Sequence, residues 1–421
     1  MKLSSLFNLA LLVIFILTWV LTGNYLFGFV ANILLSIGLF LKGRFHPFSP
    51  YSWFPPFVTL YNLSIFILDY LGYRTISTHN ELLLVNILSL LGLFVSFSFL
   101  AENKVKGLIS KNTTSDLPLN LILNFLFLAC SFVCVSFLLS GAQLKSEFSG
   151  SFNSFFKLLN FFFCVKITIY AFRNKGRFSK KIIFTFLPLI VFSSLLLGER
   201  DILFSFLIIL LMVYSFFNKD KIPTVYIIAS FLLFLIPILG EYKNLFTKTE
   251  FKEIEYSNIF ILILNGEFRS AGYNMDYILN HYDEPFRYGY SIFEDFMRSV
   301  VPGFIFEFSN SVGWYNRTYH PEIVAMGRGY GFSLSAEGFI NFGYLGVFIW
   351  YMLIGTLISF LHNLAFKSTL FFSVYIVAIP MFIYSIRGDM STLLSPLIKA
   401  IFIPLIFIVI CERFFVRLKS K

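Results

Sequence analysis

The chain has 421 residues, of which 57% are hydrophobic, 20% aromatic and only 13% charged, with a formal net charge of +10. This composition excludes an ordinary soluble globular protein and indicates an integral membrane protein. Because a membrane-crossing helix needs about 20 residues, the length allows about a dozen crossings once loops are counted. Strand-like alternation of polar and apolar residues is absent from the sequence, so we predict an all-α polytopic helical bundle.

Apolar runs between charged breaks predict about 12 membrane-crossing helices. We place them at residues 6–22, 25–41, 55–71, 82–100, 118–140, 153–172, 182–198, 202–217, 222–240, 335–360, 369–386 and 393–411. The first nine crossings lie within residues 1–240, and the last three, with a short tail, lie within residues 335–421. Between them, residues 241–334 form one large external loop.

Lysine and arginine are unevenly divided between the two sides of the membrane. With the N-terminus in the cytoplasm, the inner loops and ends carry about 18 of these residues and the short outer turns about 4. Because positive residues concentrate on the cytoplasmic side, both termini are predicted to be cytoplasmic. The net charge follows from this topology, and we predict no nucleic-acid partner.

The four cysteines fall within predicted crossings, and two of them are spaced at i, i+4. A small buried hydrophobic role is favoured over a metal site or a disulfide, because the spacing matches no familiar set of metal ligands. We therefore predict no metal. The residues are Cys130, Cys134, Cys164 and Cys411.

The external loop of roughly 95 residues is far longer than a usual connection between packed helices, which favours a functional segment. Its stretch YSIFEDFMRSVVPGF predicts an amphipathic helix lying on the outer membrane surface. Phe293, Phe296 and Val300 belong to the apolar side, whereas Glu294, Asp295 and Arg298 occupy the other. An i, i+4 pair between Glu294 and Arg298 on a solvated face is equally compatible with the pattern.

Arginines gather on the predicted outer side. A guanidinium holds phosphate oxygens in a fork and stays charged in a partly dry site, so these side chains predict a shared anion site for a lipid headgroup. Local ion pairs with neighbouring acids remain the alternative for the two arginines in outer turns. The candidates are Arg298, Arg317 and Arg328 in the loop, Arg200 in the turn GERD and Arg387 in the turn RGDM.

Two residues are candidates for proton transfer. His320 lies in YNRTYHPE directly after Arg317, and the ordinary pKa of histidine suits proton transfer near neutral pH. Glu337 is placed at the outer mouth of the tenth crossing, where a helix N-terminus stabilises a carboxylate by up to about 1 kcal/mol. It is predicted to act as a base or as an orienting acceptor.

At these positions the sequence resembles a known family. The stretch GFSLSAEGFINFGYLG, which ends the external loop, and the hairpin LLLGERDILFSFLIILL resemble the O-antigen and capsular polysaccharide polymerases of the Wzy type. The layout of about 12 crossings with one large outer loop is similar as well. The topological resemblance covers nearly the whole chain, and the residue motifs cover about 30 positions.

The resemblance implies a GT-C-like glycosyltransferase of the bacterial inner membrane. Such an enzyme moves a growing glycan from undecaprenyl diphosphate to a sugar hydroxyl of an incoming lipid-linked repeat unit, with no metal, nucleotide sugar or other cofactor. Membrane lipids and a chain-length regulator are the further partners it implies. Carried onto this chain, Arg200, Arg387, Arg317, Arg328 and Arg298 bind diphosphate, and His320 or Glu337 is the base.

Other functions are compatible with parts of the pattern. An O-antigen ligase uses the same donor with a different acceptor, and His320 does not distinguish the two enzymes. A lipid-linked oligosaccharide flippase is less favoured, because transporters usually show internal repeats and short outer loops. A membrane scaffold would leave the outer arginines without a role.

Overall fold

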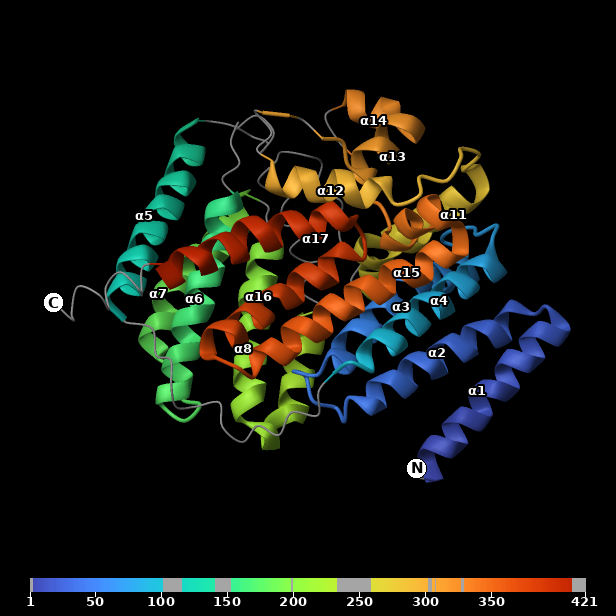
Figure 1. Ribbon diagram of the computed structural model, residues 1–421, viewed down its shortest axis with the longest axis horizontal. Coiled ribbons are helices and arrows are strands. Elements are labelled where there is room, and N and C mark those ends of the chain that lie inside the picture. The colour runs from blue at the N-terminus through green and yellow to red at the C-terminus, as the bar shows by residue number, and fades with distance from the viewer. Residues whose placement is uncertain are drawn as a thin grey trace. The chain divides into compact units, whose positions relative to one another are not determined.

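The computed structural model describes residues 3–100, 116–140, 153–197, 200–232, 259–301, 305–306, 308–326 and 329–410. Within these ranges the regular secondary structure is helical and contains no strand (Figure 1). The all-α prediction is therefore confirmed for this part of the chain.

The helices follow one another along the chain with short turns between most of them. The first group is α1 (Leu3–Thr22), α2 (Tyr25–Lys42), α3 (Pro50–Tyr70), α4 (His79–Phe97), α5 (Asp116–Ser140), α6 (Asn153–Arg173), α7 (Lys180–Leu197), α8 (Arg200–Phe217) and the short turn η2 (Lys219–Lys221), after which residues 222–232 are helical. The second group is α10 (Ile259–Ile263), the π-helix η4 (Leu264–Phe268), α11 (Arg269–His281), α12 (Tyr290–Val300), α13 (Ser311–Tyr319), α14 (Pro321–Ala325), α15 (Leu334–Ala365), α16 (Thr369–Ser385), α17 (Met390–Pro396) and the π-helix η5 (Leu397–Phe402).

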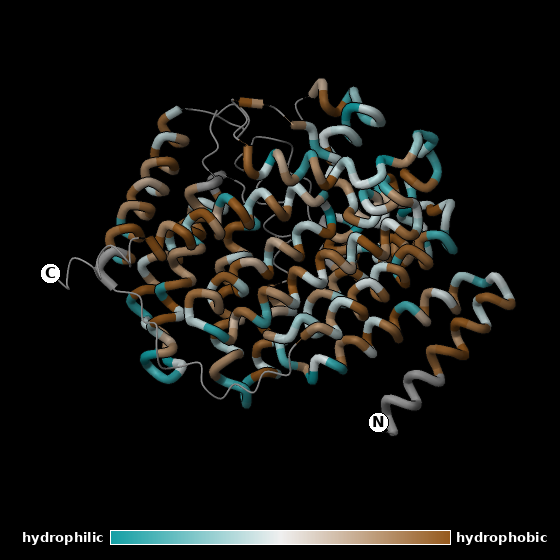
Figure 2. The backbone as a smooth tube through the Cα atoms, viewed as in Figure 1, coloured by the Kyte–Doolittle hydropathy of each residue, from teal (hydrophilic) through white to brown (hydrophobic). Residues whose placement is uncertain are grey.

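Six of the described helices are long and apolar enough to cross a membrane, and Figure 2 shows their largely hydrophobic tubes. They are Tyr25–Lys42, His79–Phe97, Leu119–Ser140, Phe155–Arg173, Leu334–Ala365 and Met390–Ile410. Each of the predicted crossings overlaps a helix, although the one at 222–240 is described only to residue 232. The chain is a membrane protein, whereas the count of 12 crossings, the GT-C-like architecture and the boundaries of the external loop stay predictions.

The described chain groups into two compact units, of which the first is built around α3. This unit comprises Met1–Ala101, Phe260–His362 and Phe382–Leu394. Most of α3 is buried, because α2, α4 and α11 pack against it. Inside, the Asn62 amide donates to Asn86 at 3.1 Å, and the Asn86 amide donates to Asn32 at 2.9 Å. These buried amides join three helices, as polar side chains commonly do in membrane bundles.

Phenylalanine rings join several helices of the second unit. This unit comprises Glu102–Ile259, Asn363–Met381 and Ser395–Lys421. The rings of Phe163 and Phe206 join α6 to α8 with centroids 4.5 Å apart, and Phe216 and Phe372 join α8 to α16 at 4.6 Å. Three cysteines of this unit are buried thiols without a disulfide, in agreement with the hydrophobic role predicted for Cys130, Cys134 and Cys164. Cys411 lies outside the described residues.

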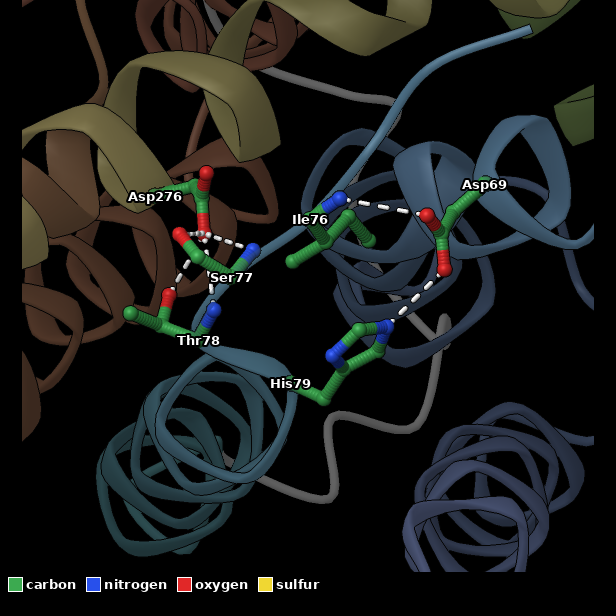
Figure 3. A network of polar contacts seen from close by, with 6 residues as sticks. All are labelled: Asp69, Ile76, Ser77, Thr78, His79 and Asp276. Atoms are coloured by element: carbon green, nitrogen blue, oxygen red, sulfur yellow. Dashed lines mark hydrogen bonds and ion pairs between the residues drawn. The ribbon is translucent and has the colours of Figure 1, made fainter. Parts of the chain in front are cut away.

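Polar contacts fasten α11, the first long helix of the loop segment, to the turn between α3 and α4 in the first unit (Figure 3). Asp276 on α11 accepts hydrogen bonds from the Thr78 hydroxyl at 2.6 Å, from the Thr78 backbone N–H at 3.1 Å and from Ser77 at 3.4 Å. Across the same turn, the carboxylate of Asp69 near the end of α3 lies 2.9 Å from Nε2 of His79 at the start of α4. In Figure 1, α11, α12, α13 and α14 gather on one side of α1–α4 and α15.

The predicted crossing at 335–360 is not one straight helix. Within α15 the backbone leaves helical geometry at Phe342 and Gly343, and Gly343 has φ of 61° and ψ of −146°. Only glycine adopts that combination readily. A Cβ on Gly346 would collide with the carbonyl oxygen of Gly338, so the segments before and after Gly343 touch backbone to backbone. We call this change of direction the reversal in α15.

Helix α12 forms where the pattern predicts it, but its polar side faces inward. Asp295 and Ser299 are buried, with relative exposures of 0% and 1%, whereas Phe293, Phe296 and Val300 are about half exposed. The expectation that Asp295 lies on the solvated side of the helix is therefore wrong. The apolar side is the exposed one, and its position on a membrane surface stays a prediction.

Candidate functional site

Glu337 lies in the first segment of α15 and has a relative exposure of 0%. Its Oε1 accepts hydrogen bonds from the hydroxyls of Ser291 at 3.0 Å and Ser311 at 3.1 Å, and its Oε2 accepts one from the Met390 backbone N–H at 2.8 Å. This single carboxylate therefore ties α12, α13 and α17 to α15. Such contacts fit the orienting acceptor among the two roles predicted for Glu337.

Asp389, which follows Arg387 in the turn before α17, is a second buried carboxylate. Its Oδ2 accepts from the Asn310 amide at 2.9 Å and from the Val312 N–H at 3.0 Å. Its Oδ1 accepts from the Ser391 hydroxyl at 2.8 Å and from the Thr392 N–H at 2.9 Å. Both oxygens of Asp389 are therefore satisfied by hydrogen-bond donors.

Asp295 completes what we call the carboxylate cluster, formed by Asp295, Glu337 and Asp389. No N–H or O–H group of the described residues makes a well-formed hydrogen bond to either oxygen of Asp295, and the nearby Ser391 backbone N–H offsets the effect of burial on its pKa only in part. Burial, followed by the nearby charges of Glu337 and Asp389, raises the pKa of Asp295 far above its ordinary value. Burying a charge without a partner is costly, and the physical response is to keep the proton.

Glu294, the residue before Asp295, lines a cavity of about 470 Å³, which we call the Arg287 pocket. Volumes of this size are typical of pockets for small ligands. Because α12 turns Glu294 and Asp295 in different directions, Glu294 faces this pocket while Asp295 faces the interior. The pocket is lined by Arg287, Tyr290, Glu294, Ser309 and Trp314.

Two guanidinium groups act on the Glu294 carboxylate. The guanidinium of Arg287 stacks over the Trp314 ring at 4.0 Å from its centroid, and Arg317 donates to the Ser309 hydroxyl at 2.6 Å. Burial raises the pKa of Glu294, while the charges of Arg287 and Arg317 lower it. The pocket thus combines a carboxylate, two fixed cations and an aromatic wall.

His320 caps the end of α13 inside a group of tyrosine rings. Its Nε2 lies 3.1 Å from the Tyr315 hydroxyl, and its ring centroid is 4.8 Å from that of Tyr330. Burial lowers the pKa of His320, while Glu322, with an oxygen 3.9 Å from Nδ1, raises it. A neutral imidazole, able to accept a proton, is therefore favoured near neutral pH.

The two predicted proton-transfer residues contact opposite ends of α13. Ser311 at its beginning binds Glu337, whereas His320 follows its end. Ser311 and His320 are nine residues apart, which corresponds to a helical rise of about 13 Å. The structure therefore does not bring His320 and Glu337 onto one reacting atom.

The predicted arginines occupy different surroundings. Arg317 and Arg298 are exposed, and Arg317 lies beside the Arg287 pocket. Arg387 is half-buried and stacks on the Tyr384 ring at 4.5 Å. Arg200 begins α8 in the second unit, and its side chain is outside the described part of the chain, as is the whole of Arg328. Their joint anion site stays a prediction.

A family comparison matches almost the whole of this helical chain. The family model described as O-antigen polysaccharide polymerase Wzy covers residues 4–419. The chain belongs to this family. Neither the comparison with curated proteins nor that with solved structures gives a significant match. The resemblance predicted from the outer-loop and hairpin motifs is thus confirmed.

For this Wzy-family chain, the sequence interpretation missed several residues that the fold brings together. Arg287 and Trp314 were not singled out, and Asp295 was assigned to the wrong side of its helix. A usable signal was present for Asp295: with Ser291 and Ser299 it forms a polar stripe at i, i+4 and i+8 on a helix with an otherwise apolar side. Such a stripe can face inward when it meets other polar groups.

Proposed function

We propose that this O-antigen polymerase joins undecaprenyl-diphosphate-linked oligosaccharide repeat units on the outer face of the bacterial inner membrane. The growing glycan passes from its lipid diphosphate to a hydroxyl of the incoming unit, without a metal ion or nucleotide sugar. Both termini are cytoplasmic in this proposal, and residues 241–334 are external. Family membership supports the polymerase reaction, and the asymmetric distribution of lysine and arginine supports the topology.

The observation that carries the proposal is the Arg287 pocket. It places the Glu294 carboxylate beside two guanidinium groups and an indole ring in the loop segment of the first unit. A sugar hydroxyl can donate to a carboxylate, a pyranose ring can pack against an aromatic wall, and diphosphate is a ligand for arginine. These are the three groups that chain growth brings together.

The proposed reaction is a substitution at the anomeric carbon of the donor glycan. The acceptor hydroxyl forms the new C–O bond, the bond to diphosphate breaks, and the diphosphate leaves with the electron pair. Arginines already in place stabilise the charge that develops on the leaving group. A carboxylate takes the proton from the hydroxyl, a step that commonly contributes about 10² to 10⁴ in rate.

Among the carboxylates, Glu294 is the base that we favour. Its pKa is raised by burial, which makes it a stronger base than an exposed glutamate, and it faces a cavity. Glu337 orients α12 and α13 through its hydrogen bonds, and His320 remains an alternative base. Arg317 and Arg387 are proposed to hold the diphosphate, together with Arg200, Arg298 and Arg328.

The glycan profile of a deletion strain tests the proposed reaction. A polymerase predicts loss of the ladder while a single repeat still reaches the surface acceptor. Long chains held on undecaprenyl diphosphate would instead identify a ligase, and single repeats trapped on the cytoplasmic side would identify a flippase. Either of these results would overturn the proposal.

Complementation of that strain tests the site. Glu294→Gln should reduce chain growth at least about tenfold, because the base is lost while the size of the side chain is kept. Glu81→Gln, at an exposed position on α4, is the matched control and should give the normal ladder. A normal ladder from Glu294→Gln would exclude Glu294 as the base.

The same strain tests the arginines that are proposed to bind diphosphate. Arg200→Ala and Arg387→Ala should each abolish chain growth with the protein still in the membrane. Long glycans in both variants would remove these two residues from the diphosphate site. Arg177→Ala, at an exposed position in the turn between α6 and α7, is the control and should have no effect.

A further inference from the structure

Asp295 has an environment that no other part of the proposed mechanism explains. The residue is fully buried, and neither of its oxygens accepts a well-formed hydrogen bond from the described residues. The buried hydroxyls on the same side of α12 are already committed, because Ser291 donates to Glu337 and Ser299 donates to the backbone oxygen of Asp295 itself. An ionised aspartate here would be a buried charge that only the Ser391 backbone N–H compensates, and only in part.

The groups that face Asp295 carry charge of the same sign. Glu337 faces it from α15 and Asp389 from the turn before α17, while α13 contributes neutral donors such as Ser311 and Asn310 to those two carboxylates. Both neighbours have the donors that an anion needs. Asp295 lacks donors of this kind, so keeping a proton is its way to avoid a buried charge.

The hydrogen bonds of Glu337 leave room for one further donor. A carboxylate can accept about four hydrogen bonds, two at each oxygen. Oε1 of Glu337 already accepts from two hydroxyls, whereas Oε2 accepts only from the Met390 N–H. A second donor to Oε2 is thus missing, and a protonated carboxyl group next to it would supply that donor.

We propose that Asp295 is a neutral carboxylic acid whose O–H donates to Glu337, and that this shared proton fastens α12 to the first segment of α15. Asp295 is then a positioning residue. Its hydrogen bond sets the orientation of α12 and so of Tyr290 and Glu294, which line the Arg287 pocket. The expected effect on chain growth rests on the proposed function of that pocket. The protonation of Asp295 does not depend on that function.

The proposal gives a definite sign for the effect of pH. Burial and the two neighbouring carboxylates raise the pKa of Asp295, so the folded protein holds a proton that the unfolded chain loses at about pH 4. The free energy of unfolding must therefore fall as the pH rises above the pKa of Asp295 in the unfolded chain. The fall ends when Asp295 also ionises in the folded protein. A conventional ionised aspartate with donors would show the opposite trend on the acid side.

The decisive variant is Asp295→Asn, tested in the full-length protein in detergent and in the deletion strain. An amide donates an N–H without a charge, so the ladder should be normal and the unfolding temperature unchanged or higher. Between pH 7 and pH 10, the unfolding temperature should fall less than that of the wild type. In infrared spectra, the carbonyl band of a protonated carboxyl group should be present in the wild type and absent from the variant.

Two further variants keep the test sharp. Asp295→Leu keeps the neutrality and removes the donor, so it should shorten or abolish the ladder and lower the unfolding temperature. Asp276→Asn is the matched control, because that carboxylate is satisfied by donors and should lose stability on neutralisation. The infrared band and the pH trend do not depend on activity, so they test the proton even if the proposed reaction is wrong.

Three results would overturn the proposal. The first is a folded Asp295→Asn protein without chain growth, which would mean that an ionised Asp295 is required. The second is an Asp295→Leu protein that matches the wild type, which would mean that the hydrogen bond is dispensable. The third is an infrared spectrum that shows no protonated carboxyl band assignable to Asp295.

Discussion

Asp276 and Asp295 are aspartates at two comparable positions, and they differ in the hydrogen-bond donors around them. Each lies on a helix of the loop segment and joins it to the end of a longer helix, Asp276 to the start of α4 and Asp295 to the start of α15. Asp276 accepts hydrogen bonds from the backbone and hydroxyl of Thr78, whereas Asp295 faces two other carboxylates. The two sites thus differ both in their N–H and O–H donors and in the charges of the neighbouring carboxylates.

The largest effect is expected at Glu337, which accepts the hydrogen bond proposed for Asp295. Glu337→Leu leaves the donors of Ser291, Ser311 and Met390 unsatisfied in the interior. At about 1 to 3 kcal/mol for each orphaned group, the free energy of unfolding should fall by about 3 kcal/mol or more, and the ladder should disappear. Thermal unfolding in detergent measures the first effect and the glycan gel the second.

A milder change at the same position separates folding from function. Glu337→Gln keeps one acceptor oxygen and should slow chain growth with the protein still in the membrane.

If the Glu337→Leu protein unfolded at the wild-type temperature, the hydrogen bonds described for Glu337 would not stabilise the fold.

Neutralising Asp276 should have an intermediate effect that contrasts with Asp295. Asp276→Asn turns charge-assisted hydrogen bonds into neutral ones, which should cost about 1 kcal/mol of unfolding free energy. The ladder should persist, because the contact lies in the turn between α3 and α4 rather than at the pocket. The comparison breaks if the two Asp→Asn variants change the unfolding temperature equally.

Removal of Trp314 should affect chain growth more than stability. Trp314→Ala removes the ring under the Arg287 guanidinium and one wall of the pocket. We expect about tenfold slower chain growth, equivalent to about 1.4 kcal/mol, with only a small shift in unfolding temperature because the ring is partly exposed. Trp314→Phe, which keeps an aromatic face, should restore most of the rate. Equal rates for both variants would argue against an aromatic contact with the substrate.

The smallest effect is expected at Arg298. Its side chain is exposed, so solvent screens its interaction with a bound diphosphate. Arg298→Ala should slow chain growth by about twofold, and the loss should grow as the ionic strength is lowered. A loss as large as that of Arg387→Ala would move the diphosphate toward the exposed end of α12.

Most of the helices could be predicted because they depend on local information. Long apolar runs with charged ends indicate α2, α4 and α6 directly, and the periodicity of residues 290–300 indicates α12. The reversal in α15 could not be predicted in the same way. Gly343 looks like one more small residue in an apolar run, and only the backbone contact between Gly338 and Gly346 reveals the change of direction.

The candidate site was less predictable because tertiary contacts assemble it. The family motif drew attention to Glu337, but the sequence gives no sign that Ser291 and Ser311, each more than 25 residues away, would donate to it. Asp295 was misplaced because an amphipathic helix on the membrane surface was expected to turn its whole polar side toward water. Beside a bilayer, lipid can cover that side, and the polar stripe is free to meet the carboxylates of α15 and α17.

The reversal in α15 also bears on hydrophobic matching with the bilayer. A straight helix of 32 residues would be about 48 Å long, well beyond a hydrocarbon layer of about 30 Å. The segment 344–365 alone is about 33 Å long, which matches that layer. Because the remaining segment is folded back against Gly346, the length of the crossing fixes the height of the carboxylate cluster relative to the hydrocarbon. A change in membrane thickness would therefore change the depth of the carboxylate cluster relative to the hydrocarbon.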